Sequence, residues 1–276
     1  SIQINYAEGY LERYEEKNKG NLGNVTSTGP ITIDQLDAKQ LQEAIEAAKK
    51  SDVAIIFAGS NRDYETEASD RRDLKLPFGQ EELIQKVLAV NPRTIVVIVA
   101  GAPFDVDAVS KKTKALVWTW FNGSEGGNAL ADVLLGKVNP SGKLPWTMPK
   151  KLMDSPAHAT NSFPGGKAVK YEEGILVGYR WFDTKNIAPL YPFGFGLSYT
   201  TFTIENAKAD KTEYALNETI SVAVEVKNTG KVDGKEVDLS LREYELLKYL
   251  LDNENIALSR DKILNNVWNY DYYGDS

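Results

Sequence analysis

The sequence predicts an α/β fold, in which a mostly parallel sheet is sandwiched by helices and is followed by an incomplete β-sandwich segment and a short helical fragment. Two observations predict this order. From about residue 35 to 135, short apolar runs alternate with segments of helical periodicity. After about residue 185, Gly, Pro and aromatic residues become dense, and a segment of two-residue alternation follows. Strands that alternate with helices indicate parallel pairing.

The α/β part is expected to contain helices and strands in regular order. Apolar residues recur three and four positions apart, as on one face of a helix, over residues 38–50, 80–90 and 125–136. Apolar runs of strand length cover residues 53–58, 94–101 and 115–121. Such runs are typical of strands buried on both faces of a sheet. Because ligands bind at the carboxyl ends of parallel strands, a site is expected in the loops that follow them.

The β-sandwich segment is expected to be cut short. Its one clear strand carries alternating apolar residues, Ile220, Val222, Val224 and Val226. This alternation predicts a half-buried antiparallel strand that ends in a turn at residues 228–230. Helical periodicity then returns in residues 240–253 and again in residues 259–268.

Composition excludes several classes of protein. The chain has 276 residues, a net charge of −7 and no cysteine. No apolar run approaches the roughly 18–20 residues of a membrane span, and the negative charge argues against nucleic-acid binding. The lack of cysteine excludes disulfides, thiolate catalysis and Cys-ligated zinc. Neither GxGxxG nor GxxxxGK[ST] occurs, so nucleotide binding has no motif.

The single histidine, His158, lies in the turn-like stretch DSPAHATNS. A Ser-His-Asp triad would depend on it alone, and a loop histidine without a role is the favoured interpretation. A catalytic zinc site normally needs more than one histidine, so no metal site is expected. The compartment is unknown from the sequence. The lack of cysteine and of a visible signal peptide favours the cytoplasm, but the start SIQINYAEGY also lacks an initiator Met and is expected to belong to a fragment.

The densest charge follows the first predicted strand. Residues 64–77 read YETEASDRRDLKLP and follow VAIIFAG (residues 53–59) after the short stretch SNRD. One interpretation is a solvated surface loop. The other is a catalytic carboxyl group at the tip of a strand, and the position at the carboxyl end of a buried strand favours it.

Four stretches resemble the carboxyl-terminal half of a glycoside hydrolase family 3 enzyme of the β-glucosidase and β-xylosidase type. They are ETEASDRRDLKLPFGQEELI, WTWFNGSEGGNALADVLLGKVNPSGKLPWTMP, KYEEGILVGYRWFD and PLYPFGFGLSYTTF. Together they span most of residues 65–203 in the family's order. The resemblance implies an α/β sandwich domain over residues 1–200. The stretch VEVKNTGKVDGKEV resembles the start of a fibronectin type III-like domain, expected over residues 201–237.

The resemblance implies a retaining β-glycosidase that hydrolyses O-glycosyl bonds, with a β-glucoside as the expected substrate. Such enzymes use two carboxyl groups about 5–5.5 Å apart, one as nucleophile and the other as acid and then base. The family's Glu–x–x–Asp–Arg pattern falls on residues 67–71. Glu67 is therefore the implied general acid/base, and Glu65 is the less favoured alternative. Asp70 and Arg71 are expected to shape the loop or to contact a sugar hydroxyl, and no metal or organic cofactor is implied.

Part of the family pattern is missing. In the family the nucleophilic Asp lies on a TIM barrel domain, and nothing in the chain matches its motif. The expected partners are therefore a β-linked sugar and this barrel domain, in cis or in trans, and the chain alone is expected to be inactive or nearly so. Ala68 and Ser69 stand where members often have Gly and an aromatic residue, which puts the substrate preference in doubt. Three tryptophans either stack on sugars or pack in the core, the second being favoured: Trp118, Trp120 and Trp181.

Residues 238–276 resemble a second family. LSLREYELLKYLLDNENIALSRDKILNNVWNYDYYGDS is similar to the first two helices of the winged-helix output domain of a two-component response regulator. The resemblance stops before the recognition helix, which would read base edges in the major groove. Residues 239–276 carry four Lys or Arg against seven Asp or Glu, a net charge of −3, so no functional nucleic-acid binding is expected. A DNA-binding regulator fragment and a non-catalytic chimeric remnant are the rival interpretations.

Overall fold

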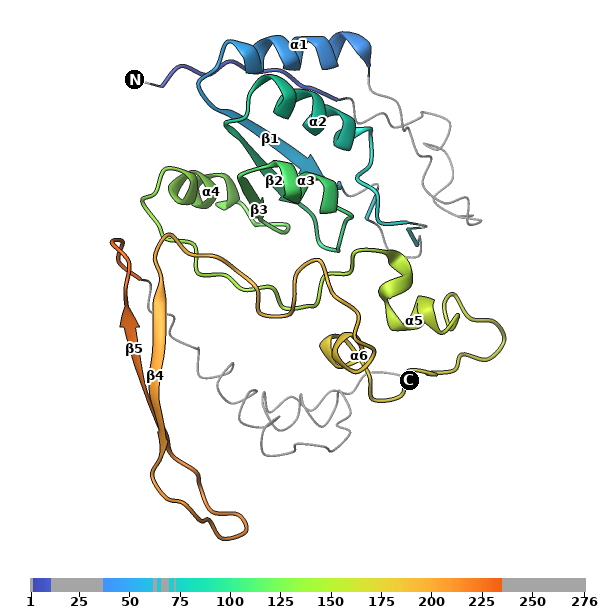
Figure 1. Cartoon of the computed structure of the whole chain (residues 1–276). Coiled ribbons are helices and arrows are strands. Elements are labelled where there is room, and N and C mark those ends of the chain that lie inside the picture. The colour runs from blue at the N-terminus through green and yellow to red at the C-terminus, as the bar shows by residue number, and fades with distance from the viewer. Residues whose placement is uncertain (1, 11–36, 62–63, 66–69, 72, 235–276) are drawn as a thin grey trace. The chain divides into compact units, whose positions relative to one another are not determined.

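The computed structural model describes residues 2–10, 37–61, 64–65, 70–71 and 73–234 (Figure 1). The chain divides into two compact units. The first comprises residues 1–138 and 142–197, and the second comprises residues 139–141 and 198–276.

The first unit is built on a parallel sheet with the strands β1 (Ala54–Gly59), β2 (Thr94–Val99) and β3 (Ala115–Trp118). Their order is β1-β2-β3, so β2 is central. Ile56 pairs with Val96, and Val96 pairs with Leu116, which fixes the register across the sheet. The predicted α/β class, a parallel sheet accompanied by helices, is confirmed.

The helices of the sheet region are α1 (Ala38–Lys49), α2 (Gln80–Val90), α3 (Asp107–Lys112) and α4 (Gly126–Leu134) (Figure 1). The Asp37 side chain begins α1 by accepting hydrogen bonds from the backbone N–H groups of Lys39 and Gln40 at 3.0 and 3.1 Å. The chain leaves α4 at Gly136, whose φ of 74° suits glycine and whose N–H donates to the Val133 carbonyl. α1, α2 and α4 confirm the predicted helices. α3 was not predicted because six residues are too few to show a helical period.

The core lies where α2 packs on the sheet. Leu83, Ile84 and Val87 share one face of α2 and are at most 4% exposed. They pack against sheet residues of one face, Ile56, Ala58, Val96 and Ile98. Full burial of such a side chain stabilises a fold by about 1.5–3 kcal/mol, so this layer is a main source of stability.

Burial on both faces was predicted for all three strands and is confirmed for β2 alone, since every residue of β3 is only partly buried. Val96, Val97 and Ile98 of β2 are fully buried. In β1, Ile55 and Phe57 are 45% and 52% exposed, so the prediction for this strand is wrong. The physical reason is position, because β1 is at the edge of the described sheet and only one of its faces packs into the core.

Gln80, the first residue of α2, completes the outer edge of β1 at its carboxyl end. Its side-chain amide accepts a hydrogen bond from the Gly59 N–H at 2.7 Å and donates one to the Gly59 carbonyl at 3.0 Å. The amide thereby replaces the peptide group of a neighbouring strand. Gln80 is 1% exposed, so both bonds form away from water.

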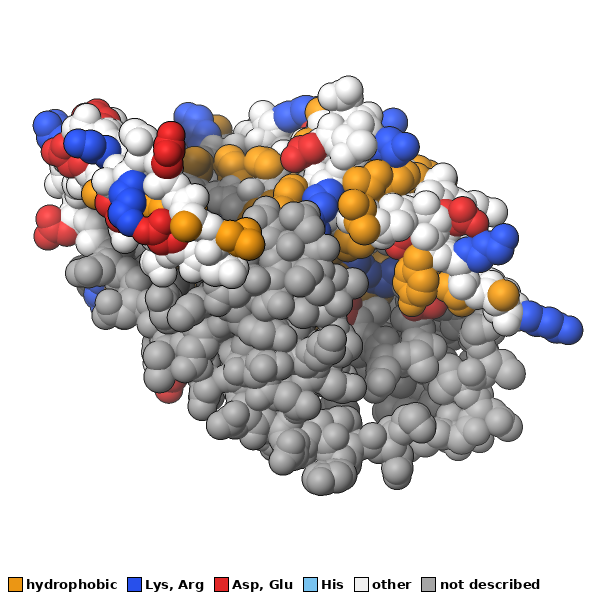
Figure 2. All heavy atoms as spheres, turned by 90° about the horizontal axis from the view of Figure 1, so that it is seen from below, with side chains coloured by type: hydrophobic (Ala, Val, Ile, Leu, Met, Phe, Trp, Pro, Cys, Tyr) orange, Lys and Arg blue, Asp and Glu red, His pale blue; other side chains and the backbone are white. Residues whose placement is uncertain are grey.

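Beyond α4 the first unit is largely irregular. Its short helices are η2 (Leu152–Asp154), α5 (Pro156–Ala159) and α6 (Tyr179–Thr184). Large apolar side chains are exposed in this region, Tyr171, Ile175 and Leu197 among them. Figure 2 shows apolar side chains interspersed with charged ones at the surface of the described residues. In the described part of the chain, no helix has the length and apolar character to cross a bilayer.

The second unit contains an antiparallel pair, β4 (Phe202–Ala209) and β5 (Val222–Asn228). β5 confirms the predicted strand, and the Asn228 side chain accepts the Gly230 N–H at 3.0 Å in the turn that follows. The expected half-burial is wrong, since every residue of β5 is exposed. Among the residues that the structure describes, no second sheet accompanies this two-stranded ribbon, so it has no face to bury. The helices expected in residues 240–253 and 259–268 lie outside the described residues.

Replacing Gln80 by Leu is expected to lower the free energy of unfolding by about 2–5 kcal/mol, because the buried N–H and C=O groups of Gly59 lose their partner. Urea unfolding followed by circular dichroism measures this loss. The matched control is Gln85→Leu on the same helix, where a single bond from Lys112 at the surface is lost. The control should change stability by about 0.5 kcal/mol or less. Equal losses in the two variants would contradict the role given to Gln80.

Candidate active site

The charged loop after β1 meets the loop after β2 at the carboxyl ends of these parallel strands. One carboxylate oxygen of Glu65 (Oε2) accepts a hydrogen bond from the backbone N–H of Gly101 at 2.9 Å. Gly101 follows β2 by two residues. A Cβ atom at Gly101 would lie 3.0 Å from the Phe121 ring and 3.4 Å from Glu65 Oε2. The close approach of the two loops therefore favours glycine at this position.

Arg71 anchors the other end of the same charged loop to the loop after β2. Its Nη1 atom lies 4.0 Å from Glu65 Oε1, and the two side chains are only 15% and 12% exposed. Its Nη2 atom donates a hydrogen bond to the Pro103 carbonyl at 3.0 Å. The guanidinium carbon lies 4.4 Å from the centre of the Phe104 ring, a cation–π contact. Three kinds of contact thus join Arg71 to Glu65 and to the loop after β2.

The electrostatics of the pair follow from this burial. Burial lowers the pKa of the Arg71 guanidinium, and the carboxylate of Glu65 opposes that shift. Arginine begins from so high a pKa that the side chain stays charged at neutral pH. The Glu65 carboxylate is therefore the counter-charge that offsets the desolvation of a buried cation.

Aromatic rings pack next to Arg71 and at the start of the charged loop. Tyr64, which is 7% exposed, lies 6.1 Å from Phe104 and 6.3 Å from Phe78, measured between ring centres. Phe78 in turn stacks on Tyr10 at 6.1 Å. Phe104 therefore contacts both Arg71 and Tyr64, which gives the start of the charged loop a rigid apolar support.

Two of the three tryptophans, Trp118 and Trp120, contact each other with ring centres 6.3 Å apart, and the third, Trp181, lies in α6. Trp118 and Trp120 lie at and beyond the carboxyl end of β3, and Trp120 packs edge-on against Trp146 with ring centres 4.6 Å apart. Trp120 has a φ of 58°, which is uncommon for a residue with a side chain. The indole N–H of Trp118 donates to the Ala100 carbonyl, and that of the buried Trp181 donates to the Asp154 carbonyl, both at 3.1 Å.

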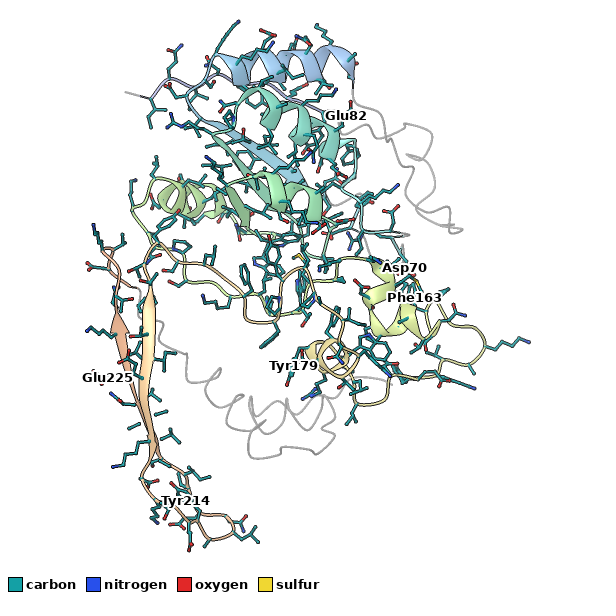
Figure 3. The ribbon with its side chains drawn as sticks, in the orientation of Figure 1. Asp70, Glu82, Phe163, Tyr179, Tyr214 and Glu225 are labelled. Atoms are coloured by element: carbon teal, nitrogen blue, oxygen red, sulfur yellow. The ribbon has the colours of Figure 1, made fainter. Side chains whose placement is uncertain are left out.

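The structure brings together only some of the predicted site residues. Glu65 and Arg71 are in contact, and Asp70 is exposed beside them in the chain (Figure 3). Glu67 lies outside the described residues, so its role stays a prediction. His158 lies in α5 with its ring 5.1 Å from that of Phe163. No group of three His, Cys, Asp or Glu suited to a metal ion occurs among the residues that the structure places.

The sequence reasoning missed the second half of the site. Gly101, Pro103 and Phe104 come from the stretch GAPF, which begins at the last residue of the second predicted strand. The signal was available, because the carboxyl ends of adjacent parallel strands meet at one edge. The side chains of GAPF are apolar and cannot act as acid, base or ligand. The role of this stretch is therefore seen only from its contacts with Glu65 and Arg71.

A parallel sheet with a carboxylate-bearing loop at its carboxyl edge defines an α/β domain with a candidate ligand site at that edge. The chain belongs to glycosyl hydrolase family 3, since the model of the family 3 C-terminal domain matches residues 2–199. A second family model, that of the transcriptional regulatory protein C-terminal region, matches residues 234–276. The two resemblances found in the sequence are thereby confirmed. The finer boundaries at residues 200 and 237 stay predictions.

Curated relatives are β-glucosidases. Beta-glucosidase BoGH3A of Bacteroides ovatus is 43% identical over 237 residues, which cover 84% of this chain and 30% of the relative. Thermostable beta-glucosidase B of Acetivibrio thermocellus is 44% identical over 205 residues, which cover 74% of this chain and 27% of the relative. The chain therefore spans less than a third of the length of these relatives.

Solved structures agree with the sequence comparison. The family 3 β-glucosidase of Bifidobacterium adolescentis matches with a TM-score of 0.67 at 40% identity, over 74% of this chain and 30% of that one. The β-glucosidase of Kluyveromyces marxianus, solved in complex with glucose, matches with a TM-score of 0.64 at 39% identity, over 72% of this chain and 23% of that one.

Replacing Glu65 by Gln is expected to lower the free energy of unfolding by about 1–3 kcal/mol, because Arg71 then stays buried without its counter-charge. Gln keeps a carbonyl oxygen for the Gly101 N–H, so the change isolates the charge. Denaturant unfolding of the whole chain measures the loss.

Asp70→Asn removes a negative charge from the exposed part of the same loop and serves as the matched control. It should change stability by no more than about 0.5 kcal/mol. The double variant Glu65→Gln/Arg71→Met should lose less than the two single losses together, since it leaves no buried charge. Additive losses would show that the two side chains do not support one another.

Proposed function

We propose that this chain supplies the acid/base-bearing part of a retaining β-glucosidase, with Glu67 as the general acid/base. The observation that carries the proposal is the anchoring of the loop around Glu67 on both sides. Glu65 is bonded to Gly101 on one side, and Arg71 is bonded to Pro103 on the other. Family membership and the β-glucosidase names of its relatives support the reaction class.

The contacts of Glu65 favour Glu67 over Glu65 for proton transfer. A general acid must carry a proton at working pH and reach the leaving oxygen. Glu65 instead accepts the Gly101 N–H and faces the Arg71 cation, so its carboxylate is held by contacts within the protein. We therefore assign Glu65 a positioning role and leave proton transfer to Glu67.

Arg71 and Asp70 take different roles in this proposal. The guanidinium of Arg71 is engaged by Glu65, the Pro103 carbonyl and the Phe104 ring. Arg71 therefore shapes the loop and is a poor candidate for a direct sugar contact. The side chain of Asp70 is exposed and is the better candidate for accepting a hydrogen bond from a sugar hydroxyl.

The proposed reaction has two steps. In the first, the Glu67 carboxyl group gives its proton to the glycosidic oxygen while a second carboxylate attacks the anomeric carbon and the aglycone leaves as an alcohol. In the second, the Glu67 carboxylate takes a proton from water, whose oxygen attacks the same carbon and releases the sugar and the nucleophile. The second carboxylate belongs to the part of the enzyme that this chain does not span, so the chain needs that part for activity.

Glu67→Gln is expected to slow hydrolysis of a β-glucoside with a poor leaving group by about 10²–10⁴, the usual contribution of a positioned acid. The bond-breaking step with a 2,4-dinitrophenyl leaving group should slow far less, because that phenolate departs without protonation. The assay uses the chain with the separately expressed remainder of BoGH3A. Rates with the two substrates are compared before and after the substitution.

Glu65→Gln is the matched control, since it should slow the hydrolysis of both substrates by a similar factor. If Glu65→Gln slowed hydrolysis in a way that depended on the leaving group, and Glu67→Gln did not, Glu65 would be the general acid/base in place of Glu67. Hydrolysis by the chain alone would show that both carboxyl groups lie within these residues. A complex that forms and stays inactive with both substrates would contradict the proposed function.

The regulator-like segment has no DNA-binding role in this proposal. Residues 239–276 have a net charge of −3, whereas tracking phosphates needs a positive surface. A gel-shift assay of the whole chain with mixed-sequence duplex DNA at physiological salt should show no retarded band. Retardation that weakens steeply with added salt would revive the rival interpretation of a DNA-binding fragment.

A further inference from the structure

The antiparallel ribbon of β4 and β5 has one apolar face and one polar face (Figure 1). Residues that pair across the two strands lie on the same face, and the faces alternate along each strand. On the polar face, Thr203 pairs with Lys227 and Glu205 pairs with Glu225. The large apolar side chains of the other face are between 47% and 72% exposed: Phe202, Ile204, Val222, Val224 and Val226.

A ribbon of this kind needs a cover for its apolar face. Two strands alone are marginally stable at best in water, and a second layer that buries one face stabilises them. Each of the valines of β5 would contribute about 1.5–3 kcal/mol if it were fully buried. A segment with a continuous apolar stripe, close to the ribbon, would supply such a layer.

The chain leaves the ribbon beside its apolar face. The Asn139 side chain donates a hydrogen bond to the Asp233 carbonyl at 3.0 Å, which holds the chain just before Gly234. A Cβ atom at Gly234 would lie 2.7 Å from the ring of Phe202. The Gly234 backbone is therefore in contact with a side chain of the apolar face, and the segment that follows begins there.

The following segment has the apolar stripe that the face needs. Helical periodicity over residues 240–253 places Tyr244, Leu247, Leu250 and Leu251 on one side of the expected helix. A helix over these residues would be about 21 Å long at about 1.5 Å per residue. The seven residues of β5 extend over about 23 Å at about 3.3 Å per residue. The two apolar surfaces therefore match in length.

We propose that the regulator-like segment of this chain covers the apolar face of β4 and β5, with the helix expected at residues 240–253 packing its stripe on that face. Residues 235–239 span at most about 18 Å when fully extended, so the helix begins close to Gly234. The model of the regulatory C-terminal region matches from residue 234, directly after the ribbon. The inference concerns the second unit alone and does not depend on the proposed function.

A second copy of the chain fits the same face less well. The short link of residues 235–239 holds the helix near the ribbon at an effective concentration of about millimolar. A second copy has to reach a similar concentration against repulsion, because each chain has a net charge of −7. A cover on the face also leaves the backbone groups at the outer edges of β4 and β5 unchanged.

Cross-linking in the whole chain tests the proposal, since the sequence has no cysteine that would compete. Val224→Cys or Val226→Cys is combined with Leu247→Cys and treated with a short bis-maleimide. We expect a cross-link within one chain, seen as a monomer of altered mobility in a denaturing gel. Glu225→Cys or Lys227→Cys with Leu247→Cys is the matched control from the polar face and should react at least about tenfold more slowly.

The other outcomes of this experiment would overturn the proposal. Equal cross-linking rates on the two faces of β5 would show that the segment has no preference for the apolar face. The absence of any cross-link would show that the segment does not reach the ribbon. Cross-links between two chains, in place of links within one chain, would show that a second copy occupies the face.

Leu247→Glu tests the same contact without a cross-linker. A charge in the stripe should release the helix, so amide hydrogen exchange in residues 222–228 should speed up by at least about tenfold, with no change in residues 94–99. Tyr249→Glu is the matched control, because the helical period places Tyr249 on the opposite side, and it should leave exchange unchanged. Equal exchange in Leu247→Glu and the parent chain would overturn the proposal.

Discussion

The register between β1 and β2 is the constraint on which the candidate site depends. Gly59 lies opposite Val99, so both strands end at the same level and their following loops begin side by side. The approach is close, since a Cβ at Gly59 would lie 2.0 Å from the Val99 carbonyl oxygen. Gly59 also has a φ of 131°, a conformation that L side chains rarely adopt. A slip of this register would separate Glu65 from the Gly101 N–H.

The pair of Glu65 and Arg71 contributes more to geometry than to net stability. Burying two opposite charges costs desolvation that their attraction only about repays. Their partners, however, are the fixed backbone groups of Gly101 and Pro103 in a different loop. The pair therefore sets where the residues between Glu65 and Arg71 begin and end. Precise positioning of this kind is what a catalytic group requires, since small displacements cost large factors in rate.

The sequence predicted the elements of the α/β unit well because long periodic segments are strong signals. α1, α2, α4, β2 and β3 fall within the expected ranges, and β1 ends one residue beyond its expected range. It could not predict the exposed face of β1, because the run VAIIFA looks the same in a central strand and in an edge strand. Burial there depends on neighbours in space. The six-residue α3 and the exposed valines of β5 escaped prediction for similar reasons.

The candidate site was predicted as a location and only partly as a set of contacts. The position of the charged loop after a buried strand indicated the correct edge of the sheet. Nothing in YETEASDRRDLKLP distinguishes a buried carboxylate from a solvated one, and Glu65 acquires its hydrogen-bond donor, Gly101, from 36 positions away. Contacts between residues so far apart in the sequence depend on the whole fold. The local sequence pattern around Glu65 does not predict them.

The ribbon of β4 and β5 has a consequence for the behaviour of the chain in concentrated solution. Ile204, Val222, Val224 and Val226 are all more than half exposed on it. Within the described residues neither outer edge of this ribbon is paired with another strand, so copies of the chain can join edge to edge. The net charge of −7 opposes such contacts by repulsion, and added salt screens that repulsion. Added salt is therefore expected to favour association of the chain through the exposed residues of this ribbon.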